Sequence, residues 1–367
     1  MSTPTKSIQV TLKNPPTEFI NPNFGESNST FAIKEQEIPD LKDGEILIKT
    51  RLISNDPTQR GWIRRKGSKR YYVDPIEIGN PMESLAIGEV LESKSTTYKK
   101  GDLINGKFYW ADFAIVNESQ IFNKIDQSLG LPLEYYLSVF GMTSLTALFG
   151  LTEAGGLKKY LGDEKPKDLT VLVSAASGAT GSVVVQIAKH LLGATKVLGI
   201  SGSDEKCKWV ESLGADKCFN YKDSNYQNQI SEYLGDSLVN VYFDNVGGEI
   251  SNFALTKMAK FGTVISCGSI STYNSSTPPS ITNWGEITVN SLSVNGFIVF
   301  DYFAKFQEGV QILSNAVKEG KIKVTNAYHV DSLEGNDEIA KFEQIPKIWT
   351  QLFNDNKPNG KLITKVA

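Results

Sequence analysis

Small residues occur at a regular spacing between Ala175 and Gly181, in the sequence Ala-Ala-Ser-Gly-Ala-Thr-Gly. Gly178 and Gly181 occupy the second and third glycine positions of the pattern G-x-G-x-x-G, and Ala176 stands at the first. The apolar run before this turn predicts a buried strand over residues 170–174, with a helix that starts inside the turn. Such a helix start offers backbone N–H groups and a positive dipole end to a phosphate. The pattern therefore predicts a dinucleotide site, the alternative being an ordinary strand–helix turn.

The end of the next predicted strand, residues 196–200, indicates which dinucleotide is bound. Sites for NAD usually place a carboxylate at this strand end, where it binds the ribose 2′-hydroxyl. Here the strand is followed by Ser201-Gly202-Ser203, which carries no carboxylate. Asp204 and Glu205 come later and suit the first turn of a helix that has Ser203 as its N-cap. Lys206 then lies within reach of a 2′-phosphate, as expected for NADP, or is simply a solvated helix lysine.

The three cysteines and two histidines are too few and too scattered for a zinc site. Zinc takes three or four ligands from cysteine, histidine or carboxylate side chains. No cysteine precedes Cys207, and Cys218 and Cys267 add no metal-binding or redox spacing. His190 falls in the helix after the glycine turn, whereas His329 lies near the end of the chain. We therefore expect no catalytic or structural metal.

Length and composition are those of an enzyme with two domains. The 367 residues exceed one average core, and 40% are hydrophobic while 22% are charged. A net charge of −3 argues against nucleic-acid binding as the main function. No apolar run approaches the ~20 residues of a membrane span, and no secretory signal is visible. We expect a cytoplasmic protein with reduced cysteines and no membrane partner, a nuclear presence being left open.

The spacing of apolar runs and turn residues predicts two domains. Residues 1–132 alternate short strands with turns, whereas strands and helices alternate over residues 133–321. The second pattern is typical of an α/β fold with a doubly wound parallel sheet. Residues 322–367 return to short predicted strands and are expected to pack on the first domain, leaving a cleft between the domains.

The individual predictions are as follows. In the first domain, strands are expected at residues 45–52, 88–92, 102–105 and 111–116. In the second domain, strands are expected at residues 170–174, 196–200, 217–219, 241–244, 263–267 and 291–300. Helices are expected at residues 182–192, 204–213, 226–234, 249–259 and 304–319, and closing strands at 323–329 and 360–366. The polar loop over residues 273–283, which contains Pro278-Pro279, is too long for a simple turn and is a candidate functional loop.

These residues resemble those of the medium-chain dehydrogenase/reductase superfamily. Within it, the chain is similar to the zinc-independent group of leukotriene B4 dehydrogenases/prostaglandin reductases and 2-alkenal (double-bond) reductases. The matching blocks are Gly141–Ala147, Ala175–Ser182, Gly202–Lys206, Phe219–Lys222, Tyr242–Gly248, Phe261-Gly262, Cys267–Asn274 and Gly360-Lys361. The resemblance implies a GroES-like, mainly β catalytic domain from residues 1–132 and 322–367. It also implies a Rossmann NADP-binding domain over residues 133–321 and a homodimer joined through the edge of the Rossmann sheet.

The resemblance further implies a set of cofactor-binding residues. The pyrophosphate of NADP(H) would contact Gly178, Ala179, Thr180 and Gly181, and the 2′-phosphate would contact Lys206 and Tyr221. The ribose and nicotinamide would be lined by Asn245, Cys267, Gly268, Ser269, Ile270, Ser271, Thr272, Tyr273, Phe297, Ile298 and Val299. Asn245 and Cys267 follow predicted parallel strands, beyond whose carboxyl ends open sheets bind ligands.

Two positions depart from the pattern of the group. Its Asp-Pro-Tyr-Met-Arg motif reads Asp56-Pro-Thr-Gln-Arg60 here, so Thr58 replaces a tyrosine of the substrate site. Pro358 stands where the group has an asparagine, and Asn359 is displaced by one position. The first change leaves the identity of the substrate open, and the second weakens one cofactor contact. Thr58, Arg60 and Trp110 are the residues expected on the substrate side.

Conjugate reduction suits a site without metal better than reduction of a plain carbonyl does, because no Lewis acid stabilises an alkoxide. Hydride from the nicotinamide would add to the β-carbon of a small apolar α,β-unsaturated aldehyde or ketone, leaving an enolate. A phenol hydrogen bond can stabilise that oxyanion. Tyr273 is the predicted donor, although a loop tyrosine more often serves packing. The leading prediction is an NADPH-dependent, zinc-free alkenal/enone reductase. The alternatives are an NADPH quinone oxidoreductase and an NADPH-binding protein with an interaction role.

Six cations occur in the eleven residues from Arg60 to Arg70. They form a solvated loop, a patch that steers an anionic substrate, or a weak RNA-binding patch. Trp62, Tyr71 and Tyr72 could stack on bases in the last case. Together with Trp110, these aromatic residues otherwise wall an apolar substrate cleft or fill the small β core.

Overall fold

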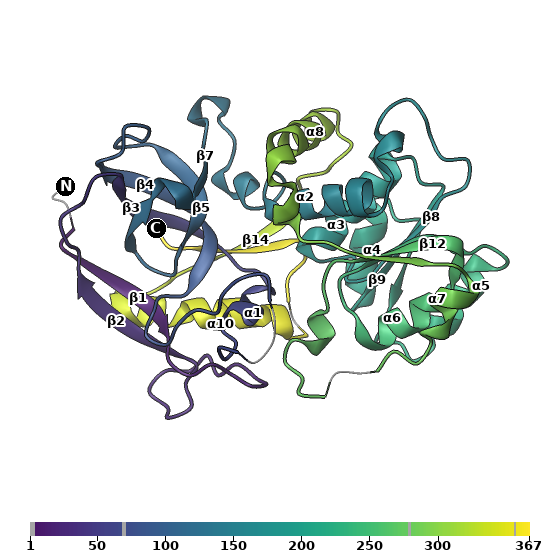
Figure 1. Ribbon diagram of the computed structural model, residues 1–367, viewed down its shortest axis with the longest axis horizontal. Helices are drawn as coiled ribbons and strands as arrows, with labels where there is room; N and C mark the ends of the chain where they lie inside the picture. Colours follow the sequence, from purple (N-terminus) through teal and green to yellow (C-terminus); the bar gives the residue numbers. More distant parts are fainter. Residues whose placement is uncertain (1–3, 68–70, 278–279, 356) are drawn as a thin grey trace. The chain divides into compact units, whose positions relative to one another are not determined.

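The computed structural model describes residues 4–67, 71–277, 280–355 and 357–367 (Figure 1). The chain divides into two compact units: Met1–Leu137 with His329–Ala367, and Ser138–Tyr328. The first unit is therefore made from both ends of the chain, and the second unit is one continuous segment.

The first unit is built mainly from antiparallel strands. Its larger sheet has seven strands in the order β14-β15-β3-β4-β5-β7, with β6 paired to β3, and β1 pairs with β2 separately. The strands are β1 (Lys6–Leu12), β2 (Phe31–Glu37), β3 (Glu45–Ser54), β4 (Glu83–Ser93), β5 (Leu103–Tyr109), β6 (Phe113–Asn117), β7 (Ile121–Lys124), β14 (Tyr328–Ser332) and β15 (Lys361–Lys365). The helices are α1 (Gln59–Trp62), α9 (Glu338–Phe342) and α10 (Gln344–Thr350).

The prediction for residues 322–367 named two strands and no helix, but α9 and α10 lie between β14 and β15, and the first strand is found at Tyr328–Ser332 rather than at residues 323–329. The carboxylate of Asp337 caps α9 by accepting hydrogen bonds from the backbone of Ile339 and Ala340. Phe342, Ile345 and Trp349 are buried in the core of the first unit. Helices this short are held by such packing rather than by intrinsic propensity, so their sequence signal is weak.

The second unit contains the parallel sheet predicted from the sequence. Its six strands have the order β10-β9-β8-β11-β12-β13. The strands are β8 (Thr170–Val173), β9 (Lys196–Ser201), β10 (Lys217–Asn220), β11 (Val239–Asp244), β12 (Met258–Ser266) and β13 (Ser293–Gly296). The helices are α2 (Met142–Phe149), α3 (Ala179–Gln186), α4 (Asp204–Ser212), α5 (Tyr226–Leu234), α6 (Gly248–Leu255), α7 (Gly285–Val289) and α8 (Phe306–Lys318). α2 and α3 continue as π-helical turns over Gly150–Ala154 and Ile187–Leu191.

The strand order reverses between β8 and β11, since the chain first adds β9 and β10 on one side and then β11 to β13 on the other. In doubly wound sheets the carboxyl ends of the strands at this switch point form the usual ligand site. The predicted strand over residues 291–300 is shorter in the structure, and the predicted helix over residues 182–192 starts earlier, inside the glycine turn.

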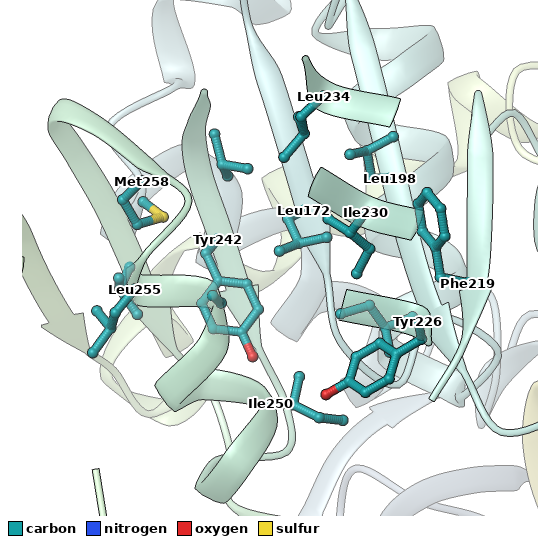
Figure 2. Close-up of a cluster of buried hydrophobic side chains, with 14 of the residues drawn as sticks. Leu172, Leu198, Phe219, Tyr226, Ile230, Leu234, Tyr242, Ile250, Leu255 and Met258 are labelled. Atoms are coloured by element: carbon teal, nitrogen blue, oxygen red, sulfur yellow. The ribbon is translucent and has the colours of Figure 1, made fainter. Parts of the chain in front are cut away.

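An apolar cluster holds α5 and α6 against the sheet of the second unit (Figure 2). Leu172 and Tyr242 come from the neighbouring strands β8 and β11, while Ile230 and Ile250 come from the two helices. All four side chains are buried. Each such side chain contributes roughly 1.5–3 kcal/mol when it is fully buried. The cluster thus fixes the strand ends at which the candidate site is built.

Candidate functional site

The turn between β8 and α3 needs glycine at position 181. A Cβ atom there would lie 2.2 Å from the carbonyl oxygen of Ala175, whereas one at Gly178 would lie 3.2 Å from the same oxygen. Ala175 itself has a φ of 48°. α3 starts directly after Gly178, which has no side chain to cap the helix. The first backbone N–H groups of α3 are therefore left for an external acceptor, which is how such turns bind a pyrophosphate.

Asn245 lies beside this turn at the switch point. Its backbone N–H donates to Ser174 Oγ over 2.9 Å, and its side-chain amide donates to the Ser174 carbonyl over 2.8 Å. Ser174 directly precedes the turn, so the ends of β8 and β11 are joined through it. The structure thus brings together two of the predicted cofactor contacts, the glycine turn and Asn245.

A buried carboxylate that was not among the predicted site residues organises the end of β11. Asp244 accepts hydrogen bonds from the backbone N–H groups of Val246 and Gly247, both over 2.9 Å. The hydroxyl groups of Ser174, Tyr242 and Ser251 also donate to it. The sequence signal was available, since an aspartate at the end of an apolar strand precedes Asn-Val-Gly-Gly. Asp244 therefore holds the turn that carries Asn245.

The segment after β12 folds onto this same turn. The backbone N–H groups of Cys267 and Gly268 donate to the Asp244 carbonyl over 2.9 and 3.1 Å. Burial, and then the negative charge of Asp244, raise the pKa of the Cys267 thiol to about 12. Cys267 therefore stays protonated at neutral pH and is a poor nucleophile.

Tyr273 follows the short 3₁₀ turn Ile270–Thr272, and its ring folds back over that turn. Its phenol oxygen accepts a hydrogen bond from the Ser269 backbone N–H over 3.4 Å. That oxygen also lies 3.3 Å from the position a Cβ atom would take at Gly268. The phenol is thus held against the backbone of Gly268 and Ser269, in the segment predicted to line the nicotinamide. Pro278-Pro279, in the same polar loop, lie outside the described residues.

Phe297 is held from two sides. Its ring centroid lies 6.5 Å from that of Phe243 and 6.4 Å from that of Tyr302. A Cβ atom at Gly150 would lie 2.8 Å from the Phe297 ring, so the π-helical turn after α2 approaches this ring closely. Ile298 and Val299 follow in the chain and lead into the 3₁₀ turn Val299–Lys305.

The predicted 2′-phosphate residues lie at the carboxyl ends of β9 and β10. Ser203 caps α4 by accepting a hydrogen bond from the Lys206 backbone N–H over 3.2 Å. The Tyr221 ring approaches to within 3.1 Å of the position a Cβ atom would take at Gly202. The Asp204 carboxylate accepts a hydrogen bond from the Asn220 side chain over 2.9 Å. Lys206 and the half-exposed Tyr221 thus follow the ends of two neighbouring strands, and an ammonium and a hydroxyl group there suit a phosphate.

The three residues predicted on the substrate side lie in the first unit in different surroundings. Thr58 Oγ1 lies 2.6 Å from the Tyr72 hydroxyl and 3.3 Å from that of Tyr71. The buried Arg60 guanidinium donates to the carbonyl oxygens of Pro16 and Glu18, so it holds the N-terminal loop. Burial lowers the pKa of Arg60. Trp110 is fully buried in the core, which is the packing role that the sequence left open.

Part of the basic segment is used structurally. Arg64 donates to the carbonyl oxygens of Gly61 and Val73 and lies 4.8 Å over the Tyr71 ring. Lys66 makes an exposed ion pair with Glu77 over 3.6 Å. Lys69 and Arg70 fall outside the described residues. Cations tied to backbone carbonyls are poorly placed to steer an anion or bind RNA, so these contacts favour the structural interpretation.

Neither a metal cluster nor a membrane span is found in the part of the chain that the structure describes. No three histidine, cysteine, aspartate or glutamate side chains among those residues lie together as metal ligands would. None of their helices combines the length and the apolar character needed to cross a bilayer. His190 contacts the Leu213 carbonyl over 2.9 Å, and His329 contacts Asp331.

Two family models match the chain. The N-terminal domain of oxidoreductases matches residues 11–124, and the zinc-binding dehydrogenase model matches residues 179–315. A putative NADP-dependent oxidoreductase of Bacillus subtilis is 36% identical, with 92% of this chain and 93% of that protein aligned. Prostaglandin reductase 1 of Bos taurus is also 36% identical, over 92% of this chain and 94% of the relative.

A plant enzyme and a solved structure extend the comparison. The NADP-dependent 2-alkenal reductase of Nicotiana tabacum is 33% identical over 86% of this chain and 87% of its own length. The crystal structure of CurA from Vibrio vulnificus in complex with NADPH superposes with a TM-score of 0.81. It is 26% identical, and the match covers 98% of this chain and 99% of CurA.

Proposed function

Because the chain belongs to the medium-chain dehydrogenase/reductase family, alongside the prostaglandin and 2-alkenal reductases, we propose that it reduces the carbon–carbon double bond of α,β-unsaturated aldehydes and ketones. It is an NADPH-dependent oxidoreductase. The activities for which these two reductases are named support the choice of an unsaturated carbonyl substrate. The observation that carries the proposal is the placement of the Tyr273 phenol against Gly268 and Ser269, in the segment expected to line the nicotinamide.

The residues of the second unit fit NADPH. Gly181 leaves room for the close turn before α3, and Gly202 leaves room for the Tyr221 ring. The cofactor, when bound, supplies the hydride for the β-carbon of the substrate. In our proposal Tyr273 donates a hydrogen bond to the developing enolate oxygen, which such a donor stabilises by a few kcal/mol. A proton from water or from Tyr273 then adds to the α-carbon and completes the reduction. Asn245 and the run from Cys267 to Tyr273 would position the ribose and nicotinamide.

The proposal is tested by following NADPH oxidation at 340 nm with a panel of enals, enones and quinones. An alkenal reductase turns over enals and enones faster than quinones, and reduces the carbon–carbon bond rather than the carbonyl, as product analysis reports. If quinones react far faster than every enal, the chain is a quinone reductase instead. If no compound in the panel oxidises NADPH, while NADPH still binds, an interaction role replaces catalysis.

Replacing Lys206 by alanine should remove most of the preference for NADPH over NADH. We expect the Kd of NADPH to rise about tenfold to a hundredfold and that of NADH to change less than twofold, since one charge-assisted phosphate contact contributes about 1.5–3 kcal/mol. Both constants can be measured by quenching of intrinsic fluorescence. Lys208→Ala is the matched control, because Lys208 is exposed on the same helix. An unaltered preference in Lys206→Ala would remove Lys206 from the phosphate site.

We also propose that two copies of the chain pair through the edge of the parallel sheet. Among the described residues β13 is the last strand in the order, and it pairs with β12 alone. All four of its residues are exposed. Large apolar side chains gather near this edge, with Phe261 72%, Val289 76% and Trp284 60% exposed. Phe261 also holds an unusual φ of 64°, and its N–H donates to the Asn290 carbonyl. A two-fold axis at this edge would pair β13 with its own copy and cover these side chains.

An acidic residue on this surface should separate the two copies. In size-exclusion chromatography with light scattering, the unaltered protein is expected at twice the 40.4 kDa of one chain and Phe261→Asp at the single mass. A buried, unpaired carboxylate at an interface is costly, which is the reason for the shift. Leu129→Asp, at an exposed apolar residue of the first unit, serves as the control and should stay dimeric. A wild-type protein that is monomeric at high concentration would refute the edge-pairing proposal.

A further inference from the structure

A buried ion pair in the first unit holds the segment that carries Thr58. The Lys361 ammonium donates to Asp56 Oδ1 over 2.5 Å and to the Asn55 carbonyl over 2.8 Å. Only 2% of the Lys361 side chain and 10% of the Asp56 side chain are exposed. The two residues are 305 positions apart in sequence. The pair therefore ties β15, near the end of the chain, to the segment that follows β3.

Further elements converge on Asp56. Its second carboxylate oxygen accepts a hydrogen bond from Ser54 Oγ, at the end of β3. The Trp349 indole N–H, on α10, donates to the backbone carbonyl of Asp56 over 2.9 Å. The backbone N–H of Asp56 donates to Gln59 Oε1 over 2.8 Å. The Gln59 amide in turn donates to the carbonyl of Glu83 on β4. The backbone and carboxylate of Asp56 are thus fixed by β3, α1, α10 and β15 together.

Stability alone explains this arrangement poorly. Burying two charges costs dehydration energy that their attraction barely returns, and apolar replacements of buried pairs are often as stable or more so. What a buried pair does provide is one defined geometry for the residues it joins. Pro57 follows Asp56 and has a fixed φ, so the orientation of Asp56 is passed on to Thr58. The Thr58 hydroxyl in turn contacts the hydroxyls of Tyr72 and Tyr71.

We propose that Lys361 and Asp56 are positioning residues for the substrate. They set the place of the Thr58 hydroxyl and of the two phenols that it contacts, while touching neither substrate nor cofactor. The inference rests on the proposed function, since it takes Thr58 as a residue of the substrate side. Loss of the pair should therefore raise the KM of the unsaturated carbonyl. The Kd of NADPH should stay the same, because the proposed ligands of the cofactor lie in the second unit.

A double-mutant cycle in kcat/KM tests this dependence. Lys361→Met should lower kcat/KM for the best enal about tenfold, mainly through KM. In the background of Thr58→Ala, the same substitution should lower it less than twofold, because there is no longer a Thr58 hydroxyl to misplace. If the two substitutions lower kcat/KM by independent, multiplying factors, Lys361 does not act through Thr58 and the inference is wrong.

Two further variants separate positioning from general destabilisation. Asp56→Asn/Lys361→Met removes both charges and leaves no unpaired buried charge, so it should fold even if Lys361→Met alone does not. The double variant should show the same rise in KM. Asp112→Asn alters a half-buried carboxylate of the first unit, which accepts hydrogen bonds from Ser7 Oγ and the Ile8 backbone. It should lower the melting temperature without changing KM. A melting temperature that falls in all variants with KM unchanged would overturn the inference.

Hydrogen–deuterium exchange gives a measurement that does not need turnover. Peptides that cover residues 54–62 should exchange faster in Asp56→Asn/Lys361→Met than in Asp112→Asn. If the unaltered protein reduces no compound of the panel, the proposed function fails, but exchange still reports on the positioning. Equal exchange in both variants would refute the positioning role, whatever the substrate is.

Discussion

Replacing Tyr273 by phenylalanine is expected to lower kcat for enals about tenfold to a hundredfold, since removal of one oxyanion donor typically costs this much or more. The Kd of NADPH should change less than twofold. The substitution removes one oxygen atom and keeps the ring over Gly268 and Ser269. Stopped-flow single turnovers with 4-deuterated NADPH would show whether hydride transfer itself is slowed, because a slower chemical step raises the isotope effect on kcat.

Tyr233→Phe is a matched control for the loss of a phenol. Tyr233 is 40% exposed in the second unit, and its hydroxyl donates to the Asp216 carbonyl over 3.5 Å. Its kcat should stay within twofold of the wild-type value. A Tyr273→Phe variant with unchanged kcat would exclude Tyr273 from the chemical step and leave the developing charge without its proposed donor.

Replacing Gly181 by alanine should weaken NADPH binding about tenfold to a hundredfold. The new methyl group would lie 2.2 Å from the Ala175 carbonyl oxygen, so the turn must move. Backbone shifts of this kind cost about 1–3 kcal/mol, and each 1.4 kcal/mol corresponds to a tenfold change in Kd. Isothermal titration calorimetry with NADPH, together with thermal unfolding, would separate the loss of binding from a loss of fold.

Other glycines of the chain provide a graded comparison. Gly178→Ala should have a smaller effect, because its methyl group would lie 3.2 Å from the same oxygen. Gly162→Ala should change neither Kd nor melting temperature, since no heavy atom lies within 4 Å and its φ is −87°. If Gly178→Ala weakens binding more than Gly181→Ala, the contact with Ala175 is not what makes position 181 special.

The parallel sheet was predictable because its signals are local. The central strands β8, β9 and β11 are buried apolar runs, each followed by a turn and a helix, and Ser203 caps α4 at the predicted position. The π-helical turns at the ends of α2 and α3 have no comparable signal. They depend on how the helices pack; Gly150, for example, fits against Phe243 and Phe297.

The contacts that position the candidate site were less predictable, because they join residues far apart in sequence. Asp56 was noted for its motif alone, and nothing local reveals that it pairs with Lys361. Trp110 was named as a substrate-side residue, but whether an aromatic side chain packs or binds depends on its neighbours. The neighbours of Trp110 are Phe31 and Trp349, whose ring centroids each lie 5.7 Å from that of Trp110. Asp244 shows the opposite case, a missed residue whose motif was visible.

The construction of the first unit from both ends of the chain has a consequence for biosynthesis. Residues are added from the N-terminus, so β3 and Asp56 leave the ribosome long before β15 and Lys361 exist. The second unit is one continuous segment and can fold during that interval. The sheet of the first unit stays incomplete until β14 and β15 have been synthesised. In a nascent chain stalled shortly before residue 361, the second unit should therefore be folded, whereas the N-terminal segment of the first unit should still be sensitive to protease. Once β15 has left the ribosome, it can pair with β3 and complete the sheet of the first unit.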